Sequence, residues 1–368
     1  MRITRLKISG VRCIAEAEIS PSRGVNLIIG NNGAGKTSLL EALHLLAYGR
    51  SFRGRVRDGL VRAGADAIEV FAEWYEETSE RHRRVGLRHT GQTWLGRLDG
   101  RDVQQLGDLC AALAVVTFEP GSHALVMGGA EPRRRLLDWG LFHVEQTKPQ
   151  GGFLSLWRRY QRALKQRNQL LKAGGHDAQL EAWDYELAET GEPLTRHRQN
   201  YIETLDVQLR HIAGDLLPTM GVARVEFQPG WARDKLSLAD ALYLARGRDQ
   251  TTGFTSVGPH RADWRVCYDA LSRGETLSRG QAKLTALAVL LAQAQHHADH
   301  RGEWPVVILD DLASELDRNH QTQLLKRLMA SQAQVFITGT EIPAVWEPIL
   351  RPVVVFHVEH GSLTPWSP

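Results

Sequence analysis

The sequence has little cysteine and no long apolar run. Its three cysteines, Cys13, Cys110 and Cys267, lie far apart and form no CxxC pair, which argues against a zinc site or a disulfide framework and suits a reducing cytosol. No run approaches the roughly 20 apolar residues that a membrane span requires. Residues 1–8 alternate as in a strand and lack the apolar core of a signal peptide. We therefore expect a cytoplasmic protein without a membrane partner.

An excess of charge of one sign is also lacking. The 45 Lys and Arg residues nearly balance the 42 Asp and Glu residues, so the formal net charge is +3. This balance permits a nucleic-acid partner but does not require one. Such a partner would need local basic clusters, which occur at residues 81–84, 133–135 and 158–159. For any single cluster, a solvated surface is the better interpretation.

Clustered metal ligands are lacking as well. The 15 histidines are scattered, and the only short cluster, His296, His297 and His300, is expected at a solvated helix end. A nuclease would need grouped His and Asp side chains for paired metals. The sequence therefore does not favour a nuclease, which we keep as an alternative of a different class.

Strand and helix patterns alternate at both ends of the chain, as in an α/β protein. Residues 15–19 alternate apolar with acidic side chains, and residues 25–29 form an apolar run that suits a strand covered on both faces. Leucines at helical spacing predict a helix over residues 38–48, which Gly49 ends. The last strand is expected at residues 353–358.

The middle of the chain has helical periodicity. One run begins at residue 153, and a second extends from about residue 180 to 212, interrupted by Gly191 and Pro193. Two such helices joined by a short turn predict an antiparallel hairpin. The domain prediction is accordingly an α/β head in two parts, residues 1–120 and 226–368, separated by a helical arm over residues 121–225.

A phosphate-binding loop follows the apolar run at residues 25–29. The stretch matches G-x-x-x-x-G-K-S/T, the Walker A motif, at every fixed position, with a strand before it and a helix after it. Its glycines allow backbone N–H groups to surround phosphates, and the helix N-terminus adds positive potential. Lys36 should reach the β- and γ-phosphates, and the Thr37 hydroxyl should coordinate Mg²⁺. The predicted ATP-binding residues are Gly30, Asn31, Asn32, Gly33, Ala34, Gly35, Lys36 and Thr37.

A second acidic motif follows a later apolar run at residues 306–309. Asp310 and Asp311 end this expected strand in the Walker B pattern. Asp310 can hold Mg²⁺ directly or through water. Asp311 would then face the attacking water and is the candidate catalytic base. Such acidic pairs also commonly cap a following helix.

The segments on either side of this strand complete the pattern. Ser278, Arg279, Gly280 and Gln281 resemble the signature sequence of ABC-type ATPases, and residues 314–317 resemble their D-loop. Ser278 can also simply N-cap the next helix. The order of the four motifs nevertheless distinguishes ABC-type ATPases from other P-loop proteins. The resemblance implies a head-to-tail dimer in which Ser278 and Gly280 contact the nucleotide on the partner's Walker A loop.

The helical insertion between Walker A and the signature resembles the SMC and DNA-repair branch and argues against a transporter cassette. Along essentially the whole chain the sequence resembles the RecF family of bacterial recombinational repair proteins. The matching segments outside the nucleotide motifs are residues 8–12, 49–53, 132–138 and 255–261. The alternatives are another SMC-like ATPase or an ABC transporter cassette.

The RecF resemblance implies a function and its partners. Such proteins bind ATP with Mg²⁺ and DNA, dimerise on ATP and hydrolyse it slowly. With RecO and RecR they help to load RecA at single-strand gaps and gap–duplex junctions. Arg12 and Arg53 resemble family positions near the nucleotide or on the head surface, and DNA would lie along residues 133–135 and the arginines of the arm.

Several positions depart from the usual pattern. Asp311 stands where most ABC-type ATPases carry Glu, and the shorter side chain predicts slow turnover and a long-lived ATP dimer. No switch histidine follows the strand at residues 335–338, so Thr338 or Thr340 are candidate substitutes. Ala262 stands where the family usually has an acid. No residue is identified for the glutamine loop.

Overall fold

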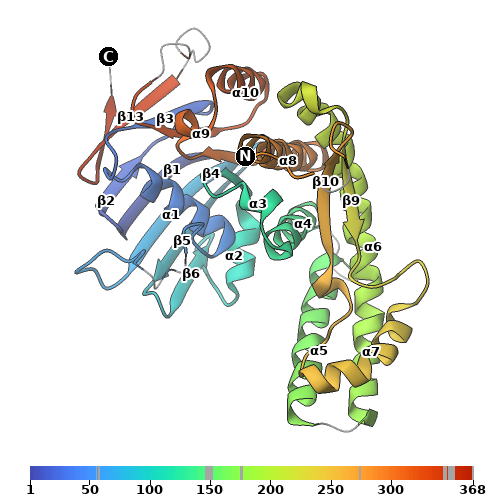
Figure 1. Cartoon of the computed structure of the whole chain (residues 1–368). Helices are drawn as coiled ribbons and strands as arrows, with labels where there is room; N and C mark the ends of the chain where they lie inside the picture. Colours follow the sequence, from blue (N-terminus) through green and yellow to red (C-terminus); the bar gives the residue numbers. More distant parts are fainter. Residues whose placement is uncertain are drawn as a thin grey trace. The chain divides into compact units, whose positions relative to one another are not determined.

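The computed structural model describes residues 1–54, 56, 59–145, 152–174, 177–272, 275–342, 346 and 353–366. The chain divides into two compact units (Figure 1), one comprising Met1–Ser122 with Leu290–Pro368 and the other His123–Val289. The second unit therefore includes residues 226–289, beyond the arm expected to end at residue 225. The assignment of head and arm functions to these segments stays a prediction.

Two six-stranded sheets form the first unit. One is antiparallel, with the strand order β2-β1-β4-β5-β6-β7. Its strands are β1 (Arg2–Val11), β2 (Ile14–Ile19), β4 (Ile68–Glu76), β5 (Arg81–His89), β6 (Trp94–Leu98) and β7 (Arg101–Val103). The other has the order β14-β13-β3-β12-β11-β8 and is parallel except for the β13–β14 pair. Its strands are β3 (Val25–Ile29), β8 (Val115–Phe118), β11 (Val306–Leu309), β12 (Val335–Gly339), β13 (Val353–Glu359) and β14 (Ser362–Trp366).

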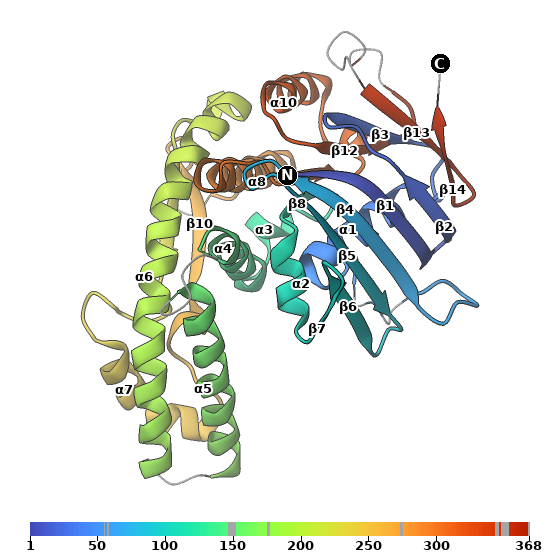
Figure 2. The ribbon, with the colours of Figure 1, turned by 180° about the vertical axis from the view of Figure 1, so that it is seen from behind.

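Helix α1 (Lys36–Tyr48) lies between these two sheets (Figures 1 and 2). Its leucines join one core cluster with Leu6 and Ile8 of the antiparallel sheet and with Ile308 and Phe336 of the parallel sheet. Almost every α1 side chain is buried, so the helix is covered on all sides and has no solvated polar face. Gly49 ends it in the left-handed conformation (φ 65°), as expected.

The remaining helices of this unit are α2 (Leu106–Ala112), α9 (Leu312–Glu315), α10 (Arg318–Ala330) and the later part of α8 (Arg279–Arg301). The strand expected at residues 353–358 is β13, but it is not the last strand. A further strand, β14, follows it and pairs with it in antiparallel orientation. Within the described residues, no helix combines the length and apolar character that a membrane crossing requires.

The second unit contains the expected helical hairpin. Helices α5 (Phe153–Ala173) and α6 (Asp177–Leu216) pack side by side (Figures 1 and 2). The other elements are α3 (Ala124–Met127), α4 (Ala130–Val144), η1 (Pro218–Met220), β9 (Ala223–Gln228), α7 (Leu238–Thr252), η2 (Pro259–Arg261), β10 (Asp263–Tyr268) and the start of α8 (Arg279–Arg301).

Helix α6 continues through Gly191 and Pro193, so these residues do not end it. A kink at these positions stays a prediction. A side chain at Gly191 would approach Leu238 to 2.5 Å and Tyr160 to 3.1 Å. The glycine thus allows α5 and α7 to pack closely on α6, and this burial offsets the weak helix propensity of the segment. The α/β class with a helical hairpin is confirmed.

Candidate functional site

The predicted nucleotide residues meet at one edge of the parallel sheet. Strand β3 pairs with β12, β12 with β11, and β11 with β8, all in parallel. The carboxyl ends of these strands therefore lie together, where open α/β sheets bind ligands. The phosphate loop leaves β3, the two aspartates leave β11, and Thr338 lies near the end of β12.

The phosphate loop has the backbone that its glycines allow. Gly30, Gly33 and Gly35 have φ values of 155°, 80° and 121°, and a side chain at Gly30 would approach the Val358 carbonyl oxygen to 2.2 Å. The Lys36 ammonium donates to the Gly30 and Asn31 carbonyl oxygens at 2.7 and 2.9 Å. Burial lowers its pKa, while Asp311 and Asp310 act in the opposite direction.

Asp310 and two threonines form an oxygen cluster beside the loop. The Thr37 hydroxyl donates to Asp310 Oδ1 at 3.0 Å, and the Thr338 hydroxyl donates to the same atom at 2.7 Å. Burial raises the pKa of Asp310, although both hydroxyls lower it. Hydroxyl and carboxylate oxygens are the ligands that Mg²⁺ prefers, so Thr37 and Asp310 fit the predicted metal site.

Asp311 lies next to this cluster in an uncommon backbone conformation. Its φ is 52°, in the left-handed region, and it begins α9. The Asp311 N–H donates to the Thr338 hydroxyl at 2.8 Å, and the Ser314 hydroxyl donates to Asp311 Oδ2 at 2.6 Å. Thr338, one of the two proposed substitutes for a switch histidine, thus contacts both aspartates.

These groups line one cleft of about 470 Å³. It brings together the phosphate loop, both aspartates, and the two arginines that the sequence could not place. Its lining also includes Glu119 and Pro120, which directly follow β8. The lining residues are Arg12, Cys13, Asn32, Gly33, Gly35, Lys36, Thr37, Ser38, Phe52, Arg53, Glu119, Pro120, Asp310, Asp311 and Thr338.

The sequence prediction missed Glu41, a fully buried carboxylate in α1. It accepts hydrogen bonds from Arg12 Nε at 2.5 Å and Nη2 at 2.8 Å, and also from the Ser51 hydroxyl. Ser51 in turn accepts from the Arg53 N–H at 2.9 Å. This network fixes both arginine-bearing segments beside the phosphate loop. The sequence signal that could have identified Glu41 is that it is the only acidic residue within the apolar run of α1.

The signature residues form a helix cap. The Ser278 N–H donates to Gln281 Oε1 at 2.8 Å, and the Gln281 N–H donates to the Ser278 hydroxyl at 3.3 Å. This reciprocal arrangement is a capping box, so the proposed capping role of Ser278 is confirmed. Ser278, Arg279 and Gly280 are exposed. None of the described residues that line the cleft belongs to the signature, and its contact with a nucleotide stays a prediction.

Within the basic cluster at residues 133–135, Arg133 is not a free phosphate-binding group, and the prediction is corrected for this residue. Arg133 is buried, and its guanidinium donates to the two Asp263 oxygens at 2.6 and 2.9 Å. Arg134 donates to the Ala262 carbonyl oxygen at 2.9 Å, and Arg135 pairs with Glu131.

Two of the three histidines near the end of α8 are not solvated, whereas His300 is exposed as expected. His296 and His297 are each 3% exposed, and His297 Nδ1 lies 3.1 Å from the Glu303 carbonyl oxygen. Burial lowers the pKa of both to about 4. Burial likewise lowers the pKa of His44 to about 3 and that of His260 to about 4.

These buried histidines predict acid sensitivity. Since their folded-state pKa values lie below the ordinary 6.5, the unfolded chain binds more protons, and stability falls as the pH drops from about 6.5 towards 4. Urea unfolding midpoints measured across this range should fall accordingly. His44→Gln should reduce the slope, whereas exposed His82→Gln should not. A midpoint independent of pH over this range would contradict the prediction.

Comparison with known proteins gives a consistent result. Residues 2–363 match the family model described as the RecF/RecN/SMC N-terminal domain. A protein of Stenotrophomonas maltophilia (strain R551-3) named DNA replication and repair protein RecF is 61% identical over 366 residues, 99% of each chain. A protein of the same name from Shewanella sediminis (strain HAW-EB3) is 38% identical, again over 99% of each chain.

Solved structures agree on the fold. A structure described as the recombination mediator protein RecF with ATP, in the RecFOR pathway, is 25% identical with a TM-score of 0.85 and covers 99% of each chain. A structure of an Smc head bound to the C-terminal winged-helix domain of ScpA has 15% identity and a TM-score of 0.62, covers 100% of this chain and 98% of its own, and shows the fold alone. The fold expected from the ABC-type resemblance is confirmed.

Proposed function

The chain belongs to the RecF family of DNA replication and repair proteins, and from this premise we propose that it is an ATP-dependent switch of recombinational repair. ATP binding assembles two copies of the chain, and the dimer binds DNA at gaps or gap–duplex junctions. There it helps RecO and RecR to load RecA in the cytoplasm. Slow hydrolysis releases the dimer.

The observation that carries this proposal is the composition of the cleft. It joins the phosphate loop with Asp310, Asp311 and Thr338 within one unit, whereas the signature belongs to the other unit. The signature is exposed at the start of α8. A second copy can therefore supply Ser278 and Gly280 to the γ-phosphate, completing two equivalent sites in a head-to-tail dimer.

The residues of the cleft have separate roles in hydrolysis. Loop N–H groups and Lys36 bind and orient the phosphates. Thr37 and Asp310 would hold Mg²⁺, which supplies charge neutralisation on the β- and γ-phosphates. Asp311 accepts a proton from the attacking water. The Ser314 hydroxyl bonds one Asp311 oxygen at 2.6 Å, which orients the carboxylate.

A complementation experiment tests the dimer. Lys36→Arg impairs the phosphate loop, and Ser278→Asn impairs the signature while keeping a good N-cap residue. In a head-to-tail dimer, each variant alone has two defective sites, but a heterodimer of the two retains one intact site. Mixing them should restore ATP-dependent dimerisation in gel filtration and ATP-dependent retention of duplex DNA, whereas ADP should support neither.

The outcomes are distinct. If each variant is defective and their mixture is no better, both halves of the site come from one chain and the dimer model is wrong. If Lys36→Arg binds DNA as the wild type does, with or without nucleotide, the switch itself is wrong. Unchanged far-ultraviolet circular dichroism would show that the Ser278 variant keeps its helix.

A further inference from the structure

The two helices of the hairpin carry opposite charge. Helix α5 contains six cationic residues and no acidic residue, since its sequence is FLSLWRRYQRALKQRNQLLKA. The facing part of α6, residues 177–192, contains six acidic residues and no Lys or Arg. Such complementarity is expected to stabilise the hairpin. Any α5 cation that is not paired in this way remains available to another partner.

Two α5 cations are engaged with α6, and a third, Arg158, has an interaction of its own. Arg159 pairs with Glu186 through two hydrogen bonds of 3.0 Å, and buried Arg167 pairs with Asp184 at 2.5 Å. The cations Arg162, Lys165 and Lys172 are instead exposed, and the described residues place no carboxylate within ion-pair distance of them.

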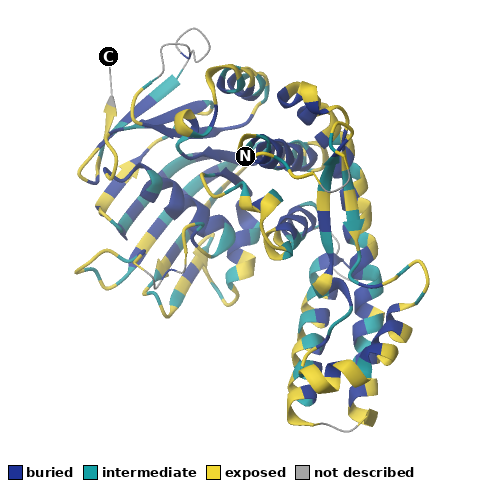
Figure 3. Ribbon diagram, in the orientation of Figure 1, coloured by how far each residue is buried: buried dark blue, intermediate teal, exposed yellow. Residues whose placement is uncertain are grey.

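The unengaged cations form a stripe along the helix. Positions 162, 165 and 172 are spaced by three and seven residues, so they share one face. Position 169 of this face is Gln and is also exposed. Figure 3 shows exposed segments along both helices of the hairpin. From 162 to 172 the stripe is about 15 Å long, since an α-helix rises 1.5 Å per residue. It contains no charge of the opposite sign. We call these three cations the α5 stripe.

The loop from Phe254 to Arg261 lies beside the α5 stripe. Asn168 lies three residues after Lys165 and four before Lys172, so it is adjacent to the stripe on the helix surface. Its side-chain oxygen accepts hydrogen bonds from the Thr255 N–H and hydroxyl at 2.8 and 2.7 Å. Exposed Arg261 adds a further cation, lying 5.1 Å from the ring of Phe254, which is 43% exposed. No residue from 254 to 261 is acidic.

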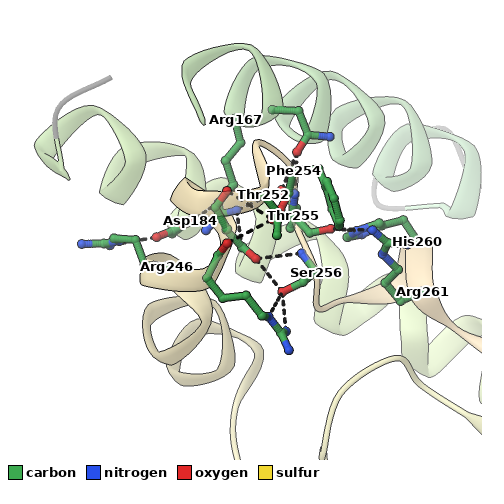
Figure 4. Close-up of polar contacts among 12 residues, drawn as sticks. Arg167, Asp184, Arg246, Thr252, Phe254, Thr255, Ser256, His260 and Arg261 are labelled. Carbon is green, nitrogen blue, oxygen red and sulfur yellow. Dashed lines mark hydrogen bonds and ion pairs between the residues drawn. The ribbon is translucent and has the colours of Figure 1, made fainter. Parts of the chain in front are cut away.

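A buried network holds this loop in place (Figure 4). Arg167 donates to Asp249 at 2.7 Å and to the Thr255 hydroxyl at 2.9 Å, and Asp249 accepts from the Ser256 hydroxyl at 2.5 Å. Further along, the Tyr160 hydroxyl lies 2.7 Å from His260 Nδ1. Arg261, whose guanidinium donates to the Thr255 carbonyl oxygen at 3.2 Å, is therefore held by rigid neighbours, which lowers the entropy lost on binding.

We propose that the α5 stripe, together with Arg261, binds the phosphate backbone of duplex DNA. This inference rests on the proposed function, which it extends by assigning the surface. Regularly spaced, acid-free cations suit a regular polyanion, and duplex DNA presents one charge per about 1.7 Å of axis. An acidic protein would instead be expected to match an irregular arrangement. The contact would be independent of base sequence.

The test compares two triple variants of the full-length chain. Arg162→Gln, Lys165→Gln and Lys172→Gln remove the α5 stripe. Arg224→Gln, Lys235→Gln and Arg265→Gln remove the same charge from other exposed positions of the same unit and serve as the control. Affinity for a duplex and for a single strand of equal length is measured with ATP at several salt concentrations.

The stripe variant should bind the duplex about 100-fold more weakly near 0.1 M salt. The slope of log affinity against log salt concentration should be shallower by about 2.7, since three cations are removed. The control should bind as the wild type does, and both should still dimerise on ATP. If the affinity of the stripe variant depends on salt concentration as strongly as that of the wild type, this inference is wrong but the proposed function is not. An equal loss in both variants, or a loss confined to the single strand, would also overturn it. If the wild type binds no DNA, the proposed function fails as well.

Discussion

Asp311→Asn is expected to slow ATP hydrolysis by about 10²- to 10⁴-fold, the usual contribution of a general base. The amide keeps the size of the side chain and can still accept a hydrogen bond from Ser314, so the cleft should keep its shape. ATP binding and ATP-dependent dimerisation should persist, and the dimer should last longer. Single-turnover hydrolysis and gel filtration measure the two effects separately.

Two further variants separate the base from its surroundings. Asp311→Glu retains a carboxylate on a longer side chain and should hydrolyse ATP faster than Asp311→Asn. Ser314→Ala removes only the 2.6 Å hydrogen bond to Asp311 and should have a much smaller effect. If Asp311→Asn hydrolyses ATP at the wild-type rate, the water is activated by another group, and the assignment of Asp311 is wrong.

Asp249→Ala is expected to destabilise the unit His123–Val289 by about 3–5 kcal/mol, the usual effect of breaking a buried ion pair. Both Asp249 and Arg167 are fully buried, so the substitution leaves the Arg167 cation with one carboxylate instead of two. It also removes the acceptor for the Ser256 N–H and hydroxyl. Differential scanning calorimetry should show a lower transition for this unit.

The matched control is Asp234→Ala, which removes an exposed aspartate from the same unit and should change stability by less than about 0.5 kcal/mol. Arg167→Met tests the same network from the other side, leaving two buried carboxylates without their shared cation. If Asp249→Ala unfolds at the wild-type temperature, the network does not hold the loop, and the rigidity assigned to Arg261 is wrong.

Local patterns predicted the strand, loop and helix around the phosphate loop because these parts are short and contiguous. The glycines of the phosphate loop, the strand before it and the helix after it are neighbours in sequence. The oxygen cluster of Thr37, Asp310 and Thr338 could be anticipated only in part, since its members are brought together by parallel strand pairing. Thr338 was one of two residues proposed to substitute for a switch histidine, and its hydroxyl is hydrogen-bonded to both aspartates.

Long-range ion pairs account for most of what the sequence did not reveal. Arg133 looked like part of an exposed basic run, but its partner Asp263 lies 130 residues away. Glu41 and Arg12 are likewise paired across two different elements. Neither periodicity nor charge spacing identifies such partners, because the energy of a buried pair depends on a geometry that only the tertiary fold supplies.

The position of α1 between two sheets has a consequence for how ATP is recognised. The helix that begins at Lys36 is covered on all sides, so its residues should open only when the whole unit unfolds. The second half of the phosphate loop is therefore ordered before any ligand arrives. A mobile loop would lose conformational entropy on binding, but here that loss has already occurred during folding. Changes in affinity should accordingly arise in the surrounding segments, at Arg12, Arg53 and Asp311.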